Sequence, residues 1–337
     1  MMEKILEVKD LNVSFNTYAG EVQAVRGVSF DLKQKECLAI VGESGSGKSV
    51  TAKAIIKLIH DPGVIKKGSS IKYLGEELAN KNFDQMRKIR GSEISMIFQD
   101  ALTSLNPTKK VGHQVAQSLI IHQKMGKREA FDKAVEMLRF VKIPNPERRA
   151  NQYPHEFSGG MRQRAMIAMA LVNKPNILIA DEPTTALDVT IQAQIIDLLK
   201  DMQEELNTAI VMITHDLGVV AGSADRIAVM YGGMIVEQGP KKEIFYRPKH
   251  PYTWALLNSV PRLNTKSKET LYSIKGTPPD LIQPPLGCPF APRCEFRLNI
   301  CNEKMPTAYP IIEGHDAKCW LLDERAPKVK VFERLEV

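Results

Sequence analysis

The fold of this chain is decided by a glycine-rich stretch at residues 42–49, which reads Gly42-Glu43-Ser44-Gly45-Ser46-Gly47-Lys48-Ser49. The stretch matches the pattern G-x-x-x-x-G-K-[ST] of a phosphate-binding loop, which requires a strand before it and a helix after it. Both are expected here. Residues 37–41 are an apolar run typical of a buried strand, and helical patterning follows from Lys48 to about Ile59. These neighbours disfavour the alternative of an ordinary Gly/Ser turn.

The chemistry of this loop follows from its residue types. Glycines let the backbone curl so that successive N–H groups point at phosphate oxygens, and the N-terminus of the following helix adds partial positive charge. We expect Lys48 to reach the β- and γ-phosphates of a nucleoside triphosphate and the Ser49 hydroxyl to bind Mg²⁺. The loop therefore predicts a Mg-ATP site.

A pair of acids ends a second apolar run. Residues 177–180 read as a buried strand, and Asp181 and Glu182 follow it directly. We expect Asp181 to hold Mg²⁺, directly or through water, and Glu182 to polarise the attacking water as general base. The alternative is a strand end that carries two solvated acids, and the phosphate loop disfavours it.

A third candidate is the helix start at Ser158-Gly159-Gly160. Ser158 is a natural N-cap, and two glycines permit close approach to an anion. The helix is expected to run to about Asn173. Taken alone, such a start is more often only a cap, but its position just ahead of the Asp-Glu strand favours an anion site.

The remaining pattern predicts an α/β fold with an appended tail. Period-2 apolar spacing in the first 35 residues predicts half-buried strands separated by Gly20 and Gly27, and residues 209–213 read as another buried strand. A short strand is expected at 94–98, a charged helical region from 105 to about 149, and a hairpin around Gly232-Gly233. Strands that alternate with helices indicate an α/β core. Prolines become frequent beyond Pro248, so we place a domain boundary near residue 250 and expect little regular structure after it.

Charge and hydropathy narrow the function without deciding it. The 337 residues include 46 Lys and Arg against 39 Asp and Glu, a net charge of +7. This excess suits nucleotide phosphates, an anionic membrane surface or nucleic acid, or it is only a solvated surface. Residues 1–10 lack the apolar region of a signal peptide, and no apolar run is long enough to span a bilayer. We therefore expect the chain to stay in the cytosol.

Four of the five cysteines lie in the last 50 residues: Cys288, Cys294, Cys301 and Cys319, with Cys37 alone elsewhere. In a reducing compartment such a cluster of cysteines favours metal binding over disulfide formation. Four thiolates suit Zn²⁺ or a [4Fe–4S] cluster, although the absence of any C-x-x-C pair weakens a zinc-finger interpretation. Free thiols are the third possibility.

Together these motifs make the sequence similar to the ABC ATPase family over nearly its whole length. Gln99 matches the Q-loop, Ser158-Gly159-Gly160 the signature motif, Ala186-Leu187-Asp188 the D-loop and His215 the switch histidine. The resemblance implies a P-loop NTPase core with an antiparallel β subdomain and a helical signature subdomain. The implied domains are a nucleotide-binding domain at 1–250, with its helical part at about 100–165, and a Pro/Cys-rich extension at 251–337.

The resemblance also implies roles for these residues. Two such domains sandwich two ATP molecules, so that Ser158, Gly159 and Gly160 complete the partner's site, and Asp188 lies at the dimer seam among the ATP-binding residues. His215 joins Glu182 and Lys48 as catalytic residues, and Gln99 joins Ser49 and Asp181 around Mg²⁺. An aromatic side chain near the N-terminus stacks on adenine, for which we choose Phe15, with Tyr18 as the alternative.

One departure identifies a branch of the family. Met161 stands where the commonest signature has Gln, and Ser158-Gly159-Gly160-Met161-Arg162-Gln163-Arg164 resembles the first of the two unlike ATPase subunits of oligopeptide/dipeptide importers. His250-Pro251-Tyr252-Thr253 and Gly276-Thr277-Pro278-Pro279-Asp280 point the same way. In some members of this branch the four cysteines bind a [4Fe–4S] cluster, and zinc remains the alternative here.

This resemblance implies the partners and the place of the protein. It implies two membrane-spanning permease subunits, a second, paralogous ATPase subunit and, indirectly, an extracytoplasmic peptide-binding protein, with no nucleic acid. The chain would lie at the cytoplasmic face of the cell membrane as a peripheral subunit.

Two other functions fit the sequence less well. A soluble ABC ATPase of translation or DNA repair is disfavoured by the single phosphate loop and by the 110 residues from Lys48 to Ser158, which leave no room for a long coiled coil. A metal-cluster sensor with vestigial ATPase activity is disfavoured because Glu182 and His215 are both present.

Overall fold

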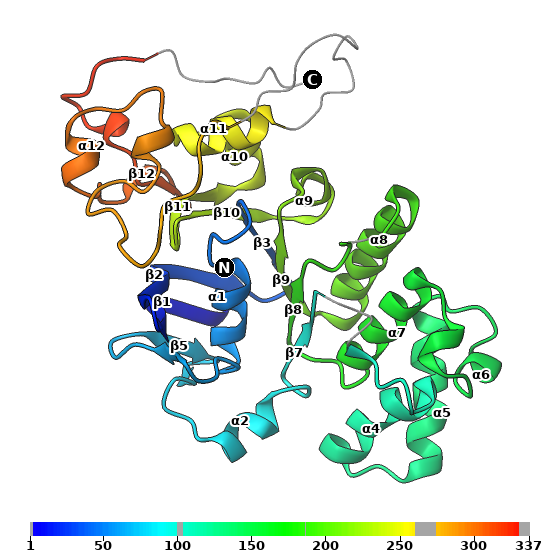
Figure 1. Ribbon diagram of the computed structural model, residues 1–337. Coiled ribbons are helices and arrows are strands. Elements are labelled where there is room, and N and C mark those ends of the chain that lie inside the picture. Colours follow the sequence, from blue (N-terminus) through cyan, green and yellow to red (C-terminus); the bar gives the residue numbers. More distant parts are fainter. Residues whose placement is uncertain (1–2, 100–103, 186, 260–273, 330–337) are drawn as a thin grey trace. The chain divides into compact units, whose positions relative to one another are not determined.

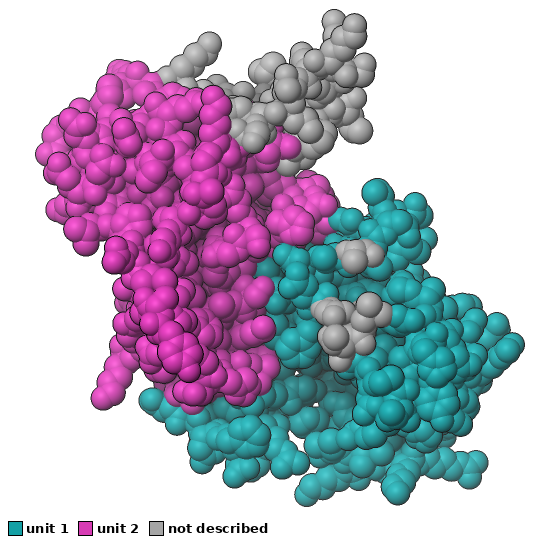
Figure 2. Space-filling model, viewed as in Figure 1, with its two compact units in different colours: residues 1–5, 32–37, 80–213 teal, residues 6–31, 38–79, 214–337 magenta. Residues whose placement is uncertain are grey.

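The computed structural model describes residues 3–99, 104–185, 187–259 and 274–329. The chain forms two compact units, each assembled from segments that are far apart in the sequence (Figure 2). The first unit consists of Met1–Ile5, Leu32–Cys37 and Asn80–Ile213, and the second of Leu6–Asp31, Leu38–Ala79 and Thr214–Val337.

The core of the first unit is a row of parallel strands in the order β7-β8-β9, at Ile94–Ile97, Ile177–Asp181 and Ala209–Thr214. β8 and β9 are buried along their whole length, as their continuous apolar runs predict. The helical pattern predicted between residues 105 and 149 is confirmed: a break at Gly126 separates two helices, and Pro146 starts a third. The helices of this unit are α2 (Phe83–Ile89), α4 (Val111–Gln123), α5 (Lys127–Phe140), α6 (Pro146–Arg149), the short 3₁₀ helix η1 (Pro154–Glu156), α7 (Gly159–Leu171) and α8 (Val189–Leu206) (Figure 1).

The second unit contains a five-stranded sheet in the order β2-β1-β5-β6, with β4 paired to β1. Its strands are β1 (Lys4–Thr17), β2 (Gly20–Lys33), β4 (Gly63–Ile65), β5 (Ser70–Tyr73) and β6 (Glu76–Glu77), drawn in blue in Figure 1. The pairs of β1 with β4 and β5, and of β5 with β6, are antiparallel. Gly27 does not separate strands as predicted but lies inside β2 with φ +64°, where its N–H donates to Asn12 Oδ1 at 2.8 Å.

A second row of strands in this unit has the order β12-β13-β11-β10-β3. The strands are β3 (Cys37–Val41), β10 (Arg226–Tyr231), β11 (Met234–Pro240), β12 (Tyr309–Ile312) and β13 (His315–Ala317). β3 and β10 are parallel, and β10 and β11 form the predicted hairpin around Gly232-Gly233. The helices are α1 (Lys48–Ile55), α9 (Leu217–Ser223), α10 (Lys241–Tyr246), α11 (Pro251–Asn258), η2 (Ala291–Arg293), α12 (Ile300–Glu303) and η3 (Trp320–Leu322).

Two local predictions need correction. Helix α1 ends at Ile55 and not near Ile59, because Lys57 adopts a left-handed conformation with φ +51°. The Leu58 N–H then donates to the Lys53 carbonyl at 2.8 Å, which closes the helix as a Schellman motif does. The C-terminal extension, expected to have little regular structure, contributes β12 and β13 to the same sheet as β11.

None of the helices in the described part of the chain combines the length and the apolar character that a membrane crossing requires.

A buried carboxylate ties the extension to the sheet. Glu237 on β11 has no exposed surface, and its oxygens accept from the backbone N–H groups of Lys249 at 2.7 Å and His250 at 3.0 Å. Nε2 of His315, on β13, lies 2.9 Å from Oε1 of the same carboxylate. Because a buried polar group costs free energy unless it is bonded, these three partners depend on Glu237.

We expect Glu237→Ala to lower the free energy of unfolding by about 3–5 kcal/mol, because it leaves His315 and two backbone N–H groups buried without their acceptor. Denaturant-induced unfolding measures the change. The control is Glu313→Ala, which removes an exposed glutamate from the turn between β12 and β13 and should have an effect below about 0.5 kcal/mol. Equal midpoints for the two variants would contradict the structural role of Glu237.

Candidate nucleotide site

The phosphate-loop motif lies between β3 and α1, as its chemistry requires. Two of its glycines leave no room for a side chain. A Cβ atom on Gly42 would lie 2.1 Å from the Met230 carbonyl oxygen, and one on Gly47, whose φ is +99°, would lie 2.4 Å from the Ala24 carbonyl oxygen. The loop therefore packs backbone against backbone, and only glycine permits that approach at these positions.

The lysine of the motif lies inside the loop. Lys48 is 5% exposed, and its Nζ donates to the carbonyl oxygens of Gly42 at 2.8 Å and Glu43 at 2.9 Å. The hydroxyl of Ser46 lies 3.5 Å from the same Nζ. The Lys48 ammonium group thus lies against the loop backbone that the motif predicts to bind phosphates. Ser49 follows Lys48 in the first turn of α1.

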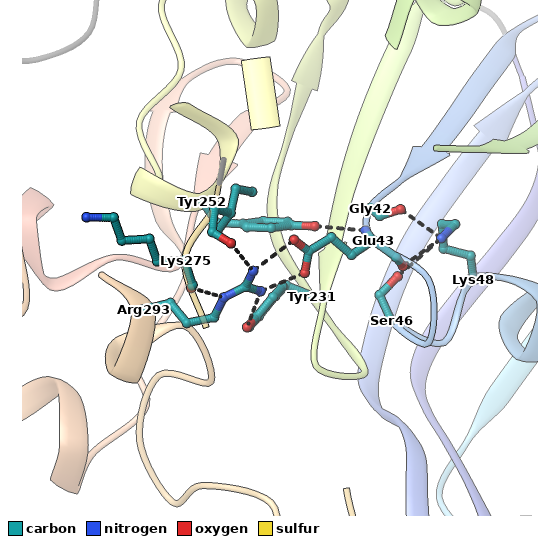
Figure 3. A network of polar contacts seen from close by, with 9 residues as sticks. Gly42, Glu43, Ser46, Lys48, Tyr231, Tyr252, Lys275 and Arg293 are labelled. Atoms are coloured by element: carbon teal, nitrogen blue, oxygen red, sulfur yellow. Dashed lines mark hydrogen bonds and ion pairs between the residues drawn. The ribbon is translucent and has the colours of Figure 1, made fainter. Parts of the chain in front are cut away.

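Neighbouring elements of the second unit hold the loop from outside (Figure 3). The Gly233 N–H, in the β10–β11 turn, donates to the Ser46 carbonyl at 3.1 Å. The Glu43 N–H donates to the Tyr252 hydroxyl at 2.9 Å, and the Glu43 carboxylate accepts from Arg293 at 2.6 and 3.1 Å. The motif at residues 42–49 predicts no role for Tyr252 or Arg293, because nothing in their local sequence indicates that they lie next to the loop.

The acid pair of the first unit stands where the sequence predicts it. Asp181 is the last residue of β8 and is 2% exposed, while Glu182 follows with φ +49°, a left-handed conformation that is uncommon for glutamate. The Gln99 Nε2 donates to Glu182 Oε2 at 2.8 Å, and the Thr185 hydroxyl donates to the same oxygen at 2.9 Å. The structure thus brings Gln99 and Glu182 into direct contact.

The signature and D-loop residues meet at two helix starts of the first unit. Ser158 caps α7 by accepting from the Met161 N–H at 3.3 Å, as predicted, and Asp188 caps α8 by accepting from the Ile191 N–H at 3.0 Å. Gly160 packs against Ile191, where an added Cβ would lie 3.0 Å from that side chain. Ser158, Gly159 and Asp188 are exposed. Ala186 lies outside the described residues.

The positions of the other predicted residues do not by themselves indicate a role. His215 is exposed and directly follows β9. Phe15 is half-buried on β1, and its ring lies where a Cβ on Gly63 of β4 would clash at 2.6 Å. Tyr18 is fully exposed in the turn after β1. The roles of all these residues stay predictions, and so does the domain boundary near residue 250.

The four C-terminal cysteines line one small pocket, together with His250, Phe290 and Trp320. Cys288, Cys301 and Cys319 are buried, Cys294 is half-buried, and all are free thiols. Burial raises the pKa of the Cys288 thiol to about 12 and that of Cys294 to about 11. Among the described residues, no group of three or more His, Cys, Asp and Glu side chains is placed to hold a metal ion.

Comparison with known proteins places these features in a family. The family model for ABC transporters matches residues 25–185, and that for the C-terminal region of oligopeptide/dipeptide transporters matches residues 236–301. The chain is 57% identical to the oligopeptide transport ATP-binding protein OppD of Bacillus subtilis, over 97% of this chain and 91% of that protein. It is 55% identical to the dipeptide transport ATP-binding protein DppD of Lactococcus lactis, over 97% and 93% of the two chains. The chain belongs to this family of ABC transporter ATP-binding subunits.

Solved ABC structures support the same assignment. The dimeric post-hydrolysis state of the ATP-binding cassette MJ0796, bound to ADP and Pi, superposes with a TM-score of 0.63 at 29% identity. The match covers 70% of this chain and 98% of that cassette. The predicted α/β P-loop fold is therefore confirmed, and the chain is an ABC-type ATPase. The C-terminal family model includes Cys288, Cys294 and Cys301, but ends before Cys319.

Proposed function

We propose that this chain is the energy-coupling ATPase of an importer for dipeptides or oligopeptides, bound to permease subunits at the cytoplasmic face of the membrane. The observation that carries the proposal is the similarity to peptide-transport subunits along nearly the whole chain, which includes the C-terminal region at 236–301 as well as the ATPase region. That C-terminal region is described for oligopeptide/dipeptide transporters, which favours an importer subunit over a soluble ABC ATPase of translation or repair.

The phosphate loop and the acid pair would divide the chemistry between them. Residues 42–49 would bind the ATP phosphates, with Lys48 at the β- and γ-phosphates. Ser49, Gln99 and Asp181 would hold Mg²⁺, and their hydroxyl, amide and carboxylate oxygens are the hard donors that this ion prefers. His215 would contact the γ-phosphate, and Phe15 would stack on adenine.

Glu182 is the best-supported general base. Its left-handed backbone is the kind of strained conformation that persists where surrounding contacts enforce it, often in active sites. Gln99 and Thr185 both donate to one carboxylate oxygen, so the group is oriented, and a carboxylate can accept a proton from water. The Gln99 contact also links the residue assigned to Mg²⁺ with the residue assigned to the water.

A second ATPase subunit would complete the site. Ser158 and Gly159 stand exposed at the N-terminus of α7, where backbone N–H groups favour an anion. Nearby, Val189 is 82% exposed directly after Asp188, although it is a large apolar side chain. We infer that this surface faces the paralogous subunit, whose ATP the α7 N-terminus would cap. An extracytoplasmic peptide-binding protein would deliver the cargo.

We expect Glu182→Gln to bind Mg-ATP and associate with the second subunit, but to hydrolyse ATP about 10²–10⁴-fold more slowly, because the amide cannot accept the proton of water. Single-turnover hydrolysis in the assembled complex is the measurement. Glu204→Gln, an exposed glutamate on α8, should keep the normal rate. Normal turnover in the Glu182→Gln complex would refute the assignment.

The import proposal is tested by co-purification. A tagged full-length chain, extracted gently from its own cell membrane, should bring down two permease proteins and one paralogous ATPase, and ATP hydrolysis should rise when peptide and its binding protein are added. Recovery of ribosomal or DNA-repair proteins in place of permeases would overturn the proposal.

The cysteine pocket is proposed to hold a [4Fe–4S] cluster. Four thiols that line one pocket form the donor set of such a cluster. Zinc, which four thiolates also suit, is the alternative. Among the described residues no group of three or more His, Cys, Asp and Glu side chains is placed to hold a metal ion, so the proposal rests on the four thiols at the pocket and on the resemblance to the importer branch. When bound, the group would supply a cross-link that orders the Pro-rich extension.

We expect anaerobically purified protein to contain about four iron atoms and four inorganic sulfides per chain. Cys301→Ser should lose most of that iron, whereas Cys37→Ser, which alters the buried thiol of β3, should retain it. Metal analysis and visible absorption measure both. A content of one zinc and no iron per chain would support a zinc site and contradict the cluster. A protein without either metal would contradict both proposals.

A further inference from the structure

An arginine of the extension reaches the phosphate loop. Arg293 ends η2 and immediately precedes Cys294, and its partner Glu43 lies 250 residues earlier in the chain. Nη1 donates to Glu43 Oε2 at 2.6 Å, and Nη2 donates to Oε1 at 3.1 Å. The pair is therefore bidentate, the geometry in which a guanidinium binds a carboxylate most strongly. Figure 3 shows the two side chains facing each other.

All five N–H donors of this guanidinium are used. Besides the two bonds to Glu43, Nη1 donates to the Tyr231 hydroxyl at 3.0 Å, Nη2 to the Ile274 carbonyl at 3.1 Å and Nε to the Lys275 carbonyl at 2.9 Å. A lysine has three donors without this planar arrangement and cannot reproduce the set. These five hydrogen bonds are thus specific for an arginine and fix the plane of its guanidinium group.

Aromatic side chains pack around Arg293. The Arg293 side chain is only 5% exposed, with its guanidinium carbon 5.7 Å from the centre of the Tyr231 ring. Tyr252 and Phe290 pack against Tyr231 with ring centres 4.5 and 5.3 Å away. Burial acts to lower the pKa of Arg293, but the bonds to Glu43 and Tyr231 outweigh it and raise the pKa above its ordinary value. The positive charge is therefore permanent.

Glu43 is held at its main chain as well. Its N–H donates to Tyr252, and its carbonyl accepts from Lys48, so both ends of the residue and its side chain are bonded. Arg293, Tyr252 and Lys48 together fix the first half of the loop. A change at Arg293 consequently acts on the backbone that presents N–H groups to phosphate.

The charge of Glu43 gives this contact its consequence. A carboxylate carried by a loop that binds polyanionic phosphates repels the ligand, and the surroundings of Glu43, whose side chain is 26% exposed, screen that repulsion less than bulk water does. From this juxtaposition we infer that Arg293 is a positioning residue for ATP binding, which neutralises Glu43 and fixes the loop around it. The inference rests on the proposed role of residues 42–49 in binding ATP phosphates.

The test is the affinity of the full-length chain for Mg-ATP, measured by calorimetry in four proteins: wild type, Arg293→Gln, Glu43→Gln and the double variant. Arg293→Gln should weaken binding about tenfold, because the Glu43 carboxylate is then an unpaired negative charge beside the phosphate loop and repels the ligand at an effective dielectric constant of about 20. In the Glu43→Gln background the same arginine change should alter affinity less than about threefold. This rescue separates charge neutralisation from a merely structural anchor.

Two controls keep the result interpretable. Arg325→Gln removes an exposed guanidinium that pairs with Asp323 in the same extension, and its affinity should equal that of wild type. Arg293→Lys keeps the charge without the fork, so its affinity should fall between those of wild type and Arg293→Gln. Circular-dichroism melting verifies folding. If Arg293→Gln does not fold, Arg293→Lys takes its place. Its loss of Mg-ATP affinity should then be smaller in the Glu43→Gln background than in the wild-type background.

Two results would overturn the inference: wild-type affinity in Arg293→Gln, or an equal loss of affinity in the single and double variants. Failure of the underlying ATP site looks different, because wild type and Arg325→Gln would then also show no binding of Mg-ATP.

Discussion

The structure around the candidate nucleotide site depends on one steric constraint, the absence of side chains at Gly42 and Gly47. Because carbonyl oxygens of Met230 and Ala24 occupy the space that a Cβ would need, the loop follows the backbone of its neighbours closely. β10 therefore shapes the loop as directly as the motif does. The same strand carries Tyr231, which bonds to Arg293, so the element that shapes the loop also connects it to the extension.

Features that are encoded by a few consecutive residues could be predicted from the sequence. The phosphate-loop motif, the buried strand before Asp181 and the hairpin at Gly232-Gly233 can each be recognised from a few neighbouring residues. The structure confirms the strand, the hairpin and the strand and helix on either side of the motif. The end of α1 was not readable, because a lysine and not a glycine takes the left-handed position at residue 57. β12 and β13 were missed for a related reason: they are short, and β12 contains Pro310, which disfavours a strand prediction.

The sequence indicated candidate site residues but not their mutual contacts. Gln99 and Glu182 were assigned separate tasks, yet strand register makes them neighbours. β7 and β8 are parallel with Ile97 opposite Ala180, so the residues two positions further along emerge together at the carboxyl edge. Asp188 was assigned to a dimer seam, and the structure adds that it caps α8. The contact between Gln99 and Glu182 depends on strand register between residues 83 positions apart, which a single sequence does not encode locally.

If Arg293 positions the loop as we infer, its contact with Glu43 connects the extension to ATP binding. Coupling between two sites is reciprocal, so whatever strengthened the contact of Arg293 with Glu43 would favour phosphate binding, and bound phosphate would strengthen that contact by the same free energy. Arg293 directly precedes a cysteine of the thiol pocket, and the Cys288 sulfur lies 3.9 Å from His250, two residues before Tyr252. Both residues that hold Glu43 from the extension side thus adjoin that pocket. On this inference, a ligand that orders the four thiols would act on the phosphate loop through Arg293 and Tyr252.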